Sequence, residues 1–179
     1  MRTFLRTSGL LLTAFAGLLV ISACAPSPAP PSPPDNTSRP SAAEPPSPTP
    51  TGTPLADVLS VTVSGEANNY RFAVEIRSPD TGCDQYADWW EVITEDGELI
   101  YRRILAHSHV DEQPFTRSGG PVPIGPESVV IVRAHMHPRG YGGTAMKGSV
   151  KDGFHPIRLG PDVAVHLEKE PPLPSGCAF

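Results

Sequence analysis

The chain has 179 residues, of which 39% are hydrophobic and 18% charged, and its formal net charge is −5 at pH 7. This length allows one domain of ordinary size. An acidic chain is a poor candidate for binding nucleic acid or an anionic lipid surface, because both are negatively charged. We therefore expect no nucleic-acid partner.

Residues 1–23 have the pattern of a secretory leader. Arg2 and Arg6 precede an apolar run over 10–21, which is shorter than the roughly 20 residues that cross a bilayer core. The run ends in Ile-Ser-Ala-Cys, which resembles the bacterial lipobox. This resemblance implies a signal peptide cleaved before Cys24, acyl chains of the palmitate type on that cysteine, and a membrane anchor made of lipid.

A lipid-anchored chain of this kind lies outside the cytoplasm on a bacterial membrane. Ala25 stands where many Gram-negative lipoproteins that stay in the inner membrane have aspartate. We therefore predict an outer-membrane location, or the cell surface in a host with a single membrane.

Lipid on Cys24 leaves Cys83 and Cys177, which would meet an oxidising environment. We predict a disulfide between them that closes a loop of about 95 residues and contributes roughly 4 to 5 kcal/mol on the chain-entropy model. It would hold the irregular tail 171–179 to the domain. Two separate free thiols are the alternative.

Residues 24–54 are predicted to be a disordered tether. Positions 25–54 hold twelve prolines among Ser, Thr and Ala, with almost nothing large enough to bury. Such a segment favours extended polyproline-like conformations, with a contour on the order of 90 Å at about 3.1 Å per residue. A proline-rich ligand for a partner domain is the alternative.

From Leu55 to the end, the hydrophobic pattern is typical of strands and predicts one domain, 55–179. Tyr70, Phe72, Val74 and Ile76 alternate with polar or small residues, as in a half-buried strand. The strands are expected at Val58–Ser64, Tyr70–Arg77, Asp88–Thr94, Leu99–His107, Ser128–His137, Thr144–Val150 and Asp162–Glu168.

Asp96 and Gly97 predict a two-residue type I′ hairpin turn, which needs positive φ at both positions. The simple register of that hairpin pairs oppositely charged residues across the strands, so Glu91 has a structural explanation and is not interpreted as catalytic. The predicted pairs are Ile93 with Ile100, Glu91 with Arg102, Trp89 with Ile104 and Trp90 with Arg103.

Seven or eight short strands in about 125 residues predict an all-β, antiparallel two-sheet sandwich of immunoglobulin or fibronectin type III character. A small β-barrel is the second choice. The blocks 82–92, 101–120 and 133–143 resemble a recurring secreted bacterial domain of this immunoglobulin-like kind that is uncharacterised, so the resemblance implies no activity.

Histidines are the main candidates for chemistry. His107 and His109, like His135 and His137, are two residues apart, so each pair would lie on one face of an extended strand. Four imidazoles on neighbouring strands could bind zinc or copper(II). Two same-face arginines, Arg103 and Arg133, oppose this hypothesis, and the face of Arg133 is predicted to be the outer, solvent-facing one.

The same face predicts a rival hypothesis, a binding surface for an anionic or sugar-like ligand, formed by Trp90, Arg103, Arg133, His107, His109 and His135. A solvated strand face with no ligand is the plain alternative. No nucleophile or pair of carboxylates stands in a recognisable setting, so we expect no catalytic residues and no cofactor.

The sequence thus predicts a membrane-anchored cell-envelope lipoprotein whose β-sandwich is a non-catalytic binding or structural module. Its partners would be the membrane, through lipid on Cys24, and an envelope glycan or protein, and the domain is expected to be monomeric. The alternatives are a metal-binding lipoprotein with copper or zinc on its histidine-rich face, and a hydrolase acting on envelope polymers.

Overall fold

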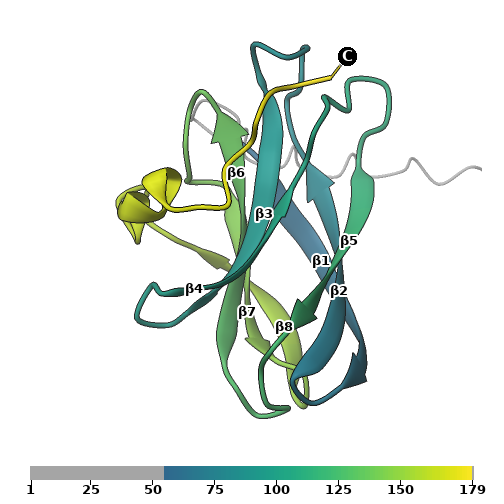
Figure 1. The fold of residues 1–179 in the computed structure, drawn as a ribbon, viewed down its shortest axis with the longest axis vertical. Coiled ribbons are helices and arrows are strands. Elements are labelled where there is room, and N and C mark those ends of the chain that lie inside the picture. Colours follow the sequence, from purple (N-terminus) through teal and green to yellow (C-terminus); the bar gives the residue numbers. More distant parts are fainter. Residues whose placement is uncertain (1–54, 179) are drawn as a thin grey trace, which may run out of the picture. The chain divides into compact units, whose positions relative to one another are not determined.

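Residues 55–178 are the part of the chain that the computed structural model describes (Figure 1). The predictions for the leader, Cys24 and the tether lie outside the described residues. The described residues form β1 (Asp57–Glu66), β2 (Asn69–Arg77), β3 (Tyr86–Thr94), β4 (Leu99–Ile104), β5 (Phe115–Val122), β6 (Val130–His137), β7 (Thr144–Ser149), β8 (Gly153–Arg158) and a short 3₁₀ helix, η1 (Val165–Lys169).

The strands form two antiparallel sheets. One has the order β1-β2-β5 and the other the order β4-β3-β6-β7-β8. The two sheets face each other in Figure 1. The prediction of an all-β, two-sheet sandwich is confirmed. No helix in the described part of the chain is long and apolar enough to cross a membrane.

The core between the sheets follows the predicted alternation. In β2, Phe72, Val74 and Ile76 are fully buried, while the residues between them point outward. In the opposite sheet, the inward-facing residues of β6 belong to the same cluster. Trp90 of β3 is also fully buried in it.

Two strands lack the alternation and escaped the sequence analysis. In β5, Gly119 is where the strand passes close to the opposite sheet, because a Cβ there would lie 2.5 Å from the Tyr101 hydroxyl. The close approach that requires glycine also removes the hydrophobic signal of a strand. In β8, Pro156 interrupts the pattern, which an edge strand tolerates because one of its sides needs no ladder hydrogen bonds.

Two other predictions of strands are wrong. The segment 162–168 forms a turn followed by η1, and Ala164 has the left-handed φ of 48° at the start of that helix. The strand predicted to reach His107 ends at Ile104, and His107 makes only an isolated bridge to Ala178. Both segments contact residues far away in the sequence: the Ala164 carbonyl accepts from Arg133, and the Ala178 N–H donates to the Ala106 carbonyl at 2.7 Å.

The β3–β4 hairpin has most of the predicted register but a different turn. Only Gly97 has positive φ, and its N–H donates to the Thr94 carbonyl at 3.1 Å, so the type I′ prediction is wrong. The loop is one residue longer, with glycine in the left-handed position. Three predicted pairs are confirmed, and a bulge moves the fourth, so that Ile93 pairs with Leu99.

Candidate functional site

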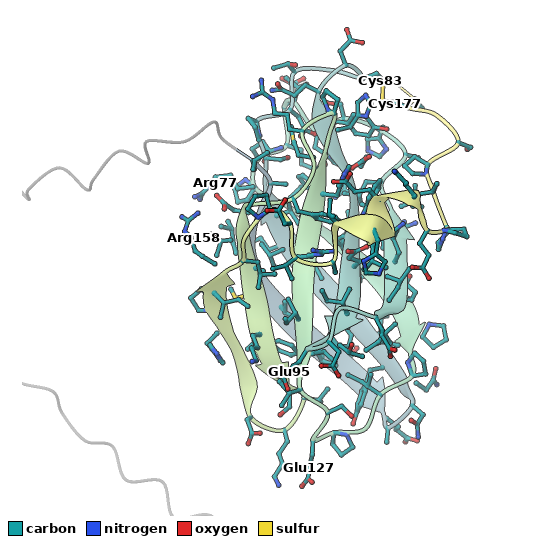
Figure 2. All side chains as sticks on the ribbon, turned by 90° about the vertical axis from the view of Figure 1, so that its left-hand side faces the viewer. Arg77, Cys83, Glu95, Glu127, Arg158 and Cys177 are labelled. Carbon is teal, nitrogen blue, oxygen red and sulfur yellow. A yellow bond between two sulfur atoms is a disulfide. The ribbon has the colours of Figure 1, made fainter. Side chains whose placement is uncertain are left out.

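The predicted Cys83–Cys177 disulfide is present, with a Cα–Cα distance of 5.6 Å (Figure 2). It attaches the end of the chain beside the start of β3. We call residues 163–178 the C-terminal strap. This segment runs over the outer face of the five-stranded sheet, and it is shown in yellow in Figure 1.

A buried charge cluster lies under the strap. Glu91 of β3 is fully buried and accepts hydrogen bonds from Arg102 at 2.6 and 2.8 Å and from Arg133 at 2.8 Å. The prediction that Arg133 faces solvent is therefore wrong, since Arg133 is only 3% exposed. Its face is the outer face of the sheet, but another segment of the chain covers it.

The two arginines also hold the strap. Arg102 donates to the carbonyls of Leu167, Glu170 and Pro172 at 2.7, 2.6 and 3.1 Å. Arg133 donates to the carbonyls of Val163 and Ala164. Each guanidinium thus joins the Glu91 carboxylate to backbone carbonyls of the strap. Two of these carbonyls, those of Ala164 and Leu167, also accept a hydrogen bond from within the strap.

Apolar packing adds a third attachment. Leu167 of η1 is fully buried in a small cluster with Ile93, Ile131 and Ala145 on the outer side of the sheet. The strap is therefore fixed by a disulfide, a buried ion cluster and a hydrophobic side chain, and it stays in place as a wall.

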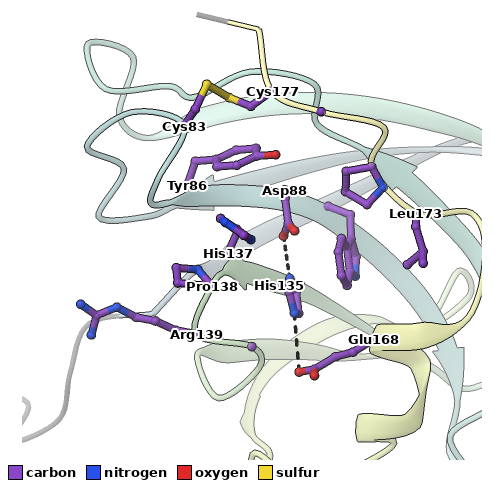
Figure 3. A pocket seen from close by; sticks show the side chains of 14 residues that line it. Cys83, Tyr86, Asp88, His135, His137, Pro138, Arg139, Glu168, Leu173 and Cys177 are labelled. Carbon is purple, nitrogen blue, oxygen red and sulfur yellow. Dashed lines mark hydrogen bonds and ion pairs between the residues drawn. A yellow bond between two sulfur atoms is a disulfide. The ribbon is translucent and has the colours of Figure 1, made fainter.

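Beside this wall lies a cleft of about 800 Å³ (Figure 3). The start of β3, the end of β6 with the residues after it, and the strap all contribute to it. The lining residues are Cys83, Tyr86, Asp88, Trp89, His135, His137, Pro138, Arg139, Gly140, Glu168, Leu173, Pro174, Gly176 and Cys177.

The inner wall of the cleft is an imidazole between two carboxylates, as the dashed lines in Figure 3 show. His135 Nδ1 is 2.6 Å from Asp88 Oδ1, and His135 Nε2 is 3.6 Å from Glu168 Oε1. Since the carboxylate can only accept, Nδ1 carries the proton of the shorter contact. We call Asp88, His135 and Glu168 the cleft triad.

Aromatic and cationic groups fix the position of His135. Its ring stacks on Trp89 with the centroids 3.7 Å apart and the planes 5° from parallel. Arg102 lies over the Trp89 ring, 4.5 Å from its centroid. Tyr141 packs edge-on against His135, and burial together with the nearby Glu91 carboxylate raises the pKa of Tyr141.

The rim of the cleft carries exposed hydrogen-bonding groups. His137 is exposed, with its ring centroid 5.8 Å from that of Tyr86, and Arg139 donates from Nε to Gln85 Oε1 at 3.2 Å. Burial, followed by the charge of Asp88, raises the pKa of Tyr86. The cleft therefore combines two carboxylates on its inner wall with the Arg139 guanidinium at its rim.

His107 and His109 lie in a separate place, a smaller hollow of about 420 Å³ formed by the loop after β4. The His109 ring stacks on Phe115 at 3.7 Å. Burial, and then the positive charge of Arg117, lower the pKa of His109 to about 4. His109 is therefore neutral at pH 7, and it packs as an aromatic ring whose backbone N–H donates to Asp80 at 2.8 Å.

The structure thus divides the predicted site residues. Trp90 is in the core, Arg133 is bound to Glu91, and Arg103 is exposed on β4. The four histidines separate into two pairs in different hollows, and no three His, Cys, Asp or Glu side chains of residues 55–178 are placed to hold a metal ion.

Two members of the cleft triad, Asp88 and Glu168, were not among the predicted site residues. Asp88 had a usable signal, because it adjoins Trp89, whose pairing with Ile104 was predicted correctly. Glu168 had none, because its position depends on the path of the strap, which Arg102 and Arg133 determine.

Comparison with known proteins gives one informative match. The chain is 40% identical over 112 residues to a protein of Halomicrobium mukohataei named "Putative lipoprotein". The aligned region is 61% of this chain and 55% of the relative, so the chain spans about half the length of the curated relative it matches. No protein-family model and no solved structure matches the chain.

Proposed function

We propose that the chain is a lipoprotein anchored in a cell envelope through Cys24. The Ile-Ser-Ala-Cys sequence after an apolar run and the name of the relative support this proposal. Two or more acyl chains form a stable anchor without a spanning helix. In cells that express the chain, Cys24→Ser should abolish incorporation of labelled palmitate and release the protein from membranes. Unchanged labelling would contradict the proposal.

We further propose that the β-sandwich is a non-catalytic binding module and that the cleft beside the C-terminal strap takes the ligand. The observation that carries this proposal is the cleft triad, in which polar side chains are held in fixed positions inside a hollow of about 800 Å³. Sites for small ligands have this form, a concavity with a few converging polar groups.

The chemistry of the cleft favours a ligand rich in hydroxyl or amino groups, such as a fragment of an envelope glycan. Glu168 is a strong acceptor for such groups, and His137 and Arg139 add donors at the rim. Stacking of a sugar on Trp89 does not contribute, because His135 and Arg102 already occupy the two faces of its ring.

The test is calorimetric titration of the purified full-length protein in detergent with neutral hexoses and with amino sugars. Glu168→Gln should weaken binding at least tenfold. Glu127→Gln is the matched control, because Glu127 is exposed at the end of the sandwich opposite the disulfide (Figure 2). The proposal would be overturned if the protein bound neither class of sugar, or if both variants weakened binding equally.

A further inference from the structure

The structure also points to a function of the cleft triad that needs no organic ligand. We propose that His135 Nε2 and the Glu168 carboxylate bind one divalent transition-metal ion of the zinc or copper class, and that Asp88 is a positioning residue behind the imidazole. This inference does not depend on the proposed glycan binding, and it replaces the four-histidine arrangement predicted from the sequence.

The tautomer of His135 makes Nε2 the ring nitrogen that can bind a metal ion. Asp88 Oδ1 accepts the Nδ1 proton at 2.6 Å, so in the neutral ring the lone pair belongs to Nε2. A carboxylate that holds one ring nitrogen and leaves the other for a metal ion is the usual arrangement around metal-binding histidines, where it fixes the ring and raises its basicity. Asp88 is almost fully buried, which keeps this contact in place.

The Glu168 carboxylate faces the Nε2 lone pair of His135. Glu168 Oε1 is 3.6 Å from Nε2, too far for a hydrogen bond. Beside a neutral ring the Nε2 lone pair and the carboxylate oxygen repel each other, and either a proton on Nε2 or a metal ion between the two atoms removes that repulsion. An ion about 2.1 Å from both atoms would make an angle of about 120° with them, near the tetrahedral geometry of zinc sites. The spacing therefore suits one shared ion.

The charged side chains that line the cleft favour a cation. Two arginines argued against a metal ion, and neither lines the cleft. Arg133 is bound to Glu91 and to strap carbonyls, and Arg103 is exposed on β4. The inner wall instead carries two carboxylates around one imidazole, which favours a cation. Arg139 is the one arginine or lysine among the lining residues, and it lies at the rim, bonded to Gln85.

His137 and water are the candidates for the remaining coordination positions of the ion. His137 lies two residues after His135 on β6 and lines the same cleft, but its ring is turned toward Tyr86. A change of its χ angles would bring it toward the ion as a third protein ligand. The positions left over would be open to water, as in metal sites that exchange a bound molecule.

The experiment uses metal-free, tag-free full-length protein in detergent, titrated with Cu²⁺ and Zn²⁺ and followed by tryptophan fluorescence. Trp89 stacks on His135, so Cu²⁺ bound at Nε2 should quench its emission, and Zn²⁺ should compete for the site. His135→Ala and Glu168→Gln should each weaken binding at least tenfold. Asp88→Asn should weaken it about 10- to 100-fold, as loss of a residue behind a ligand does.

His155→Ala is the matched control, because His155 is exposed on the edge strand β8. Glu168→Gln keeps the test valid if His135→Ala fails to fold, since Glu168 is on the strap and its side chain is 34% exposed. Wild-type protein that binds neither ion, or binding lost in His107→Ala and retained in Glu168→Gln, would overturn the inference. Metal binding without sugar binding would support the metal site and reject the proposed glycan function.

Discussion

Strands β2 and β3 are both central to their sheets, yet they have opposite environments. In β2, the residues on the outer side are exposed or half-buried, whereas in β3 every residue from Tyr86 to Ile93 is buried. The difference comes from outside the strands, because the C-terminal strap covers the outer side of β3, whereas the outer side of β2 keeps exposed and half-buried residues. A strand's own sequence therefore reports its inner face better than its outer one.

The largest expected effect is at the charge cluster under the strap. Glu91→Ala would leave Arg102 and Arg133 buried without their carboxylate, and breaking such a buried ion cluster costs about 3 to 5 kcal/mol of unfolding free energy. On β2, Glu75→Ala removes a hydrogen bond from Ser60 and should cost about 0.5 kcal/mol or less. Urea denaturation of both variants measures the contrast. Equal losses would break the comparison of the two strands.

The next effect is at the disulfide. The variant with Ser at both Cys83 and Cys177 should lose about 2 to 4 kcal/mol, because the unfolded chain gains the freedom of the opened loop. This loss is below the roughly 4 to 5 kcal/mol of the chain-entropy model, because a reduced, unfolded chain retains some structure. In native-state hydrogen exchange, the amides of the strap should lose protection first and those of β2 should keep theirs. Simultaneous loss in both regions would show that the strap does not open separately.

A smaller effect tests the close approach between the sheets. Gly119→Ala would place a Cβ 2.5 Å from the Tyr101 hydroxyl and 2.9 Å from the Trp90 ring, so neighbours must shift at a cost of about 1 to 3 kcal/mol. Gly160→Ala is the control, because a Cβ there would meet nothing within 4 Å. Thermal denaturation should separate the two variants, and equal melting temperatures would contradict the packing.

The effect that is smallest at neutral pH is the pH dependence of stability due to His109. Its pKa of about 4 in the folded protein is below the ordinary value of 6.5, so the unfolded chain binds the proton more readily. Stability should therefore be complete above pH 6.5 and fall as the pH drops toward 4, by at most about 1.4 kcal/mol per pH unit. His109→Gln should flatten the curve in urea denaturation series, and an unchanged slope would reject this origin.

Local patterns were sufficient for much of the fold. Alternation identified the inward faces of β2 and β6, and the hairpin register set by Asp96 and Gly97 predicted the pairing of Glu91 with Arg102. The disulfide followed from the count of cysteines. β5 and β8 were missed because Gly119 and Pro156, which their positions require or tolerate, remove the signal of a strand.

The candidate site was only partly predictable for a related reason. His135 was singled out from its spacing, but its partner Glu168 comes from a segment that was predicted as a strand and is held by distant arginines. Arg133 was assigned to a solvated face because its sequence neighbours alternate, and alternation does not reveal that another segment covers that face.

The cleft and its binding groups depend on the strap, which is a fixed wall held by Glu91 and its two arginines. Hydrogen exchange of the wild-type chain and Glu91→Gln, compared at the amides of Leu167, Glu170 and Ala178, tests this directly, because all three donate to backbone carbonyls. The account predicts slow exchange in the wild type and fast exchange at Leu167 and Glu170 in the variant, with β2 unchanged. Fast exchange at all three amides in the wild type would contradict it.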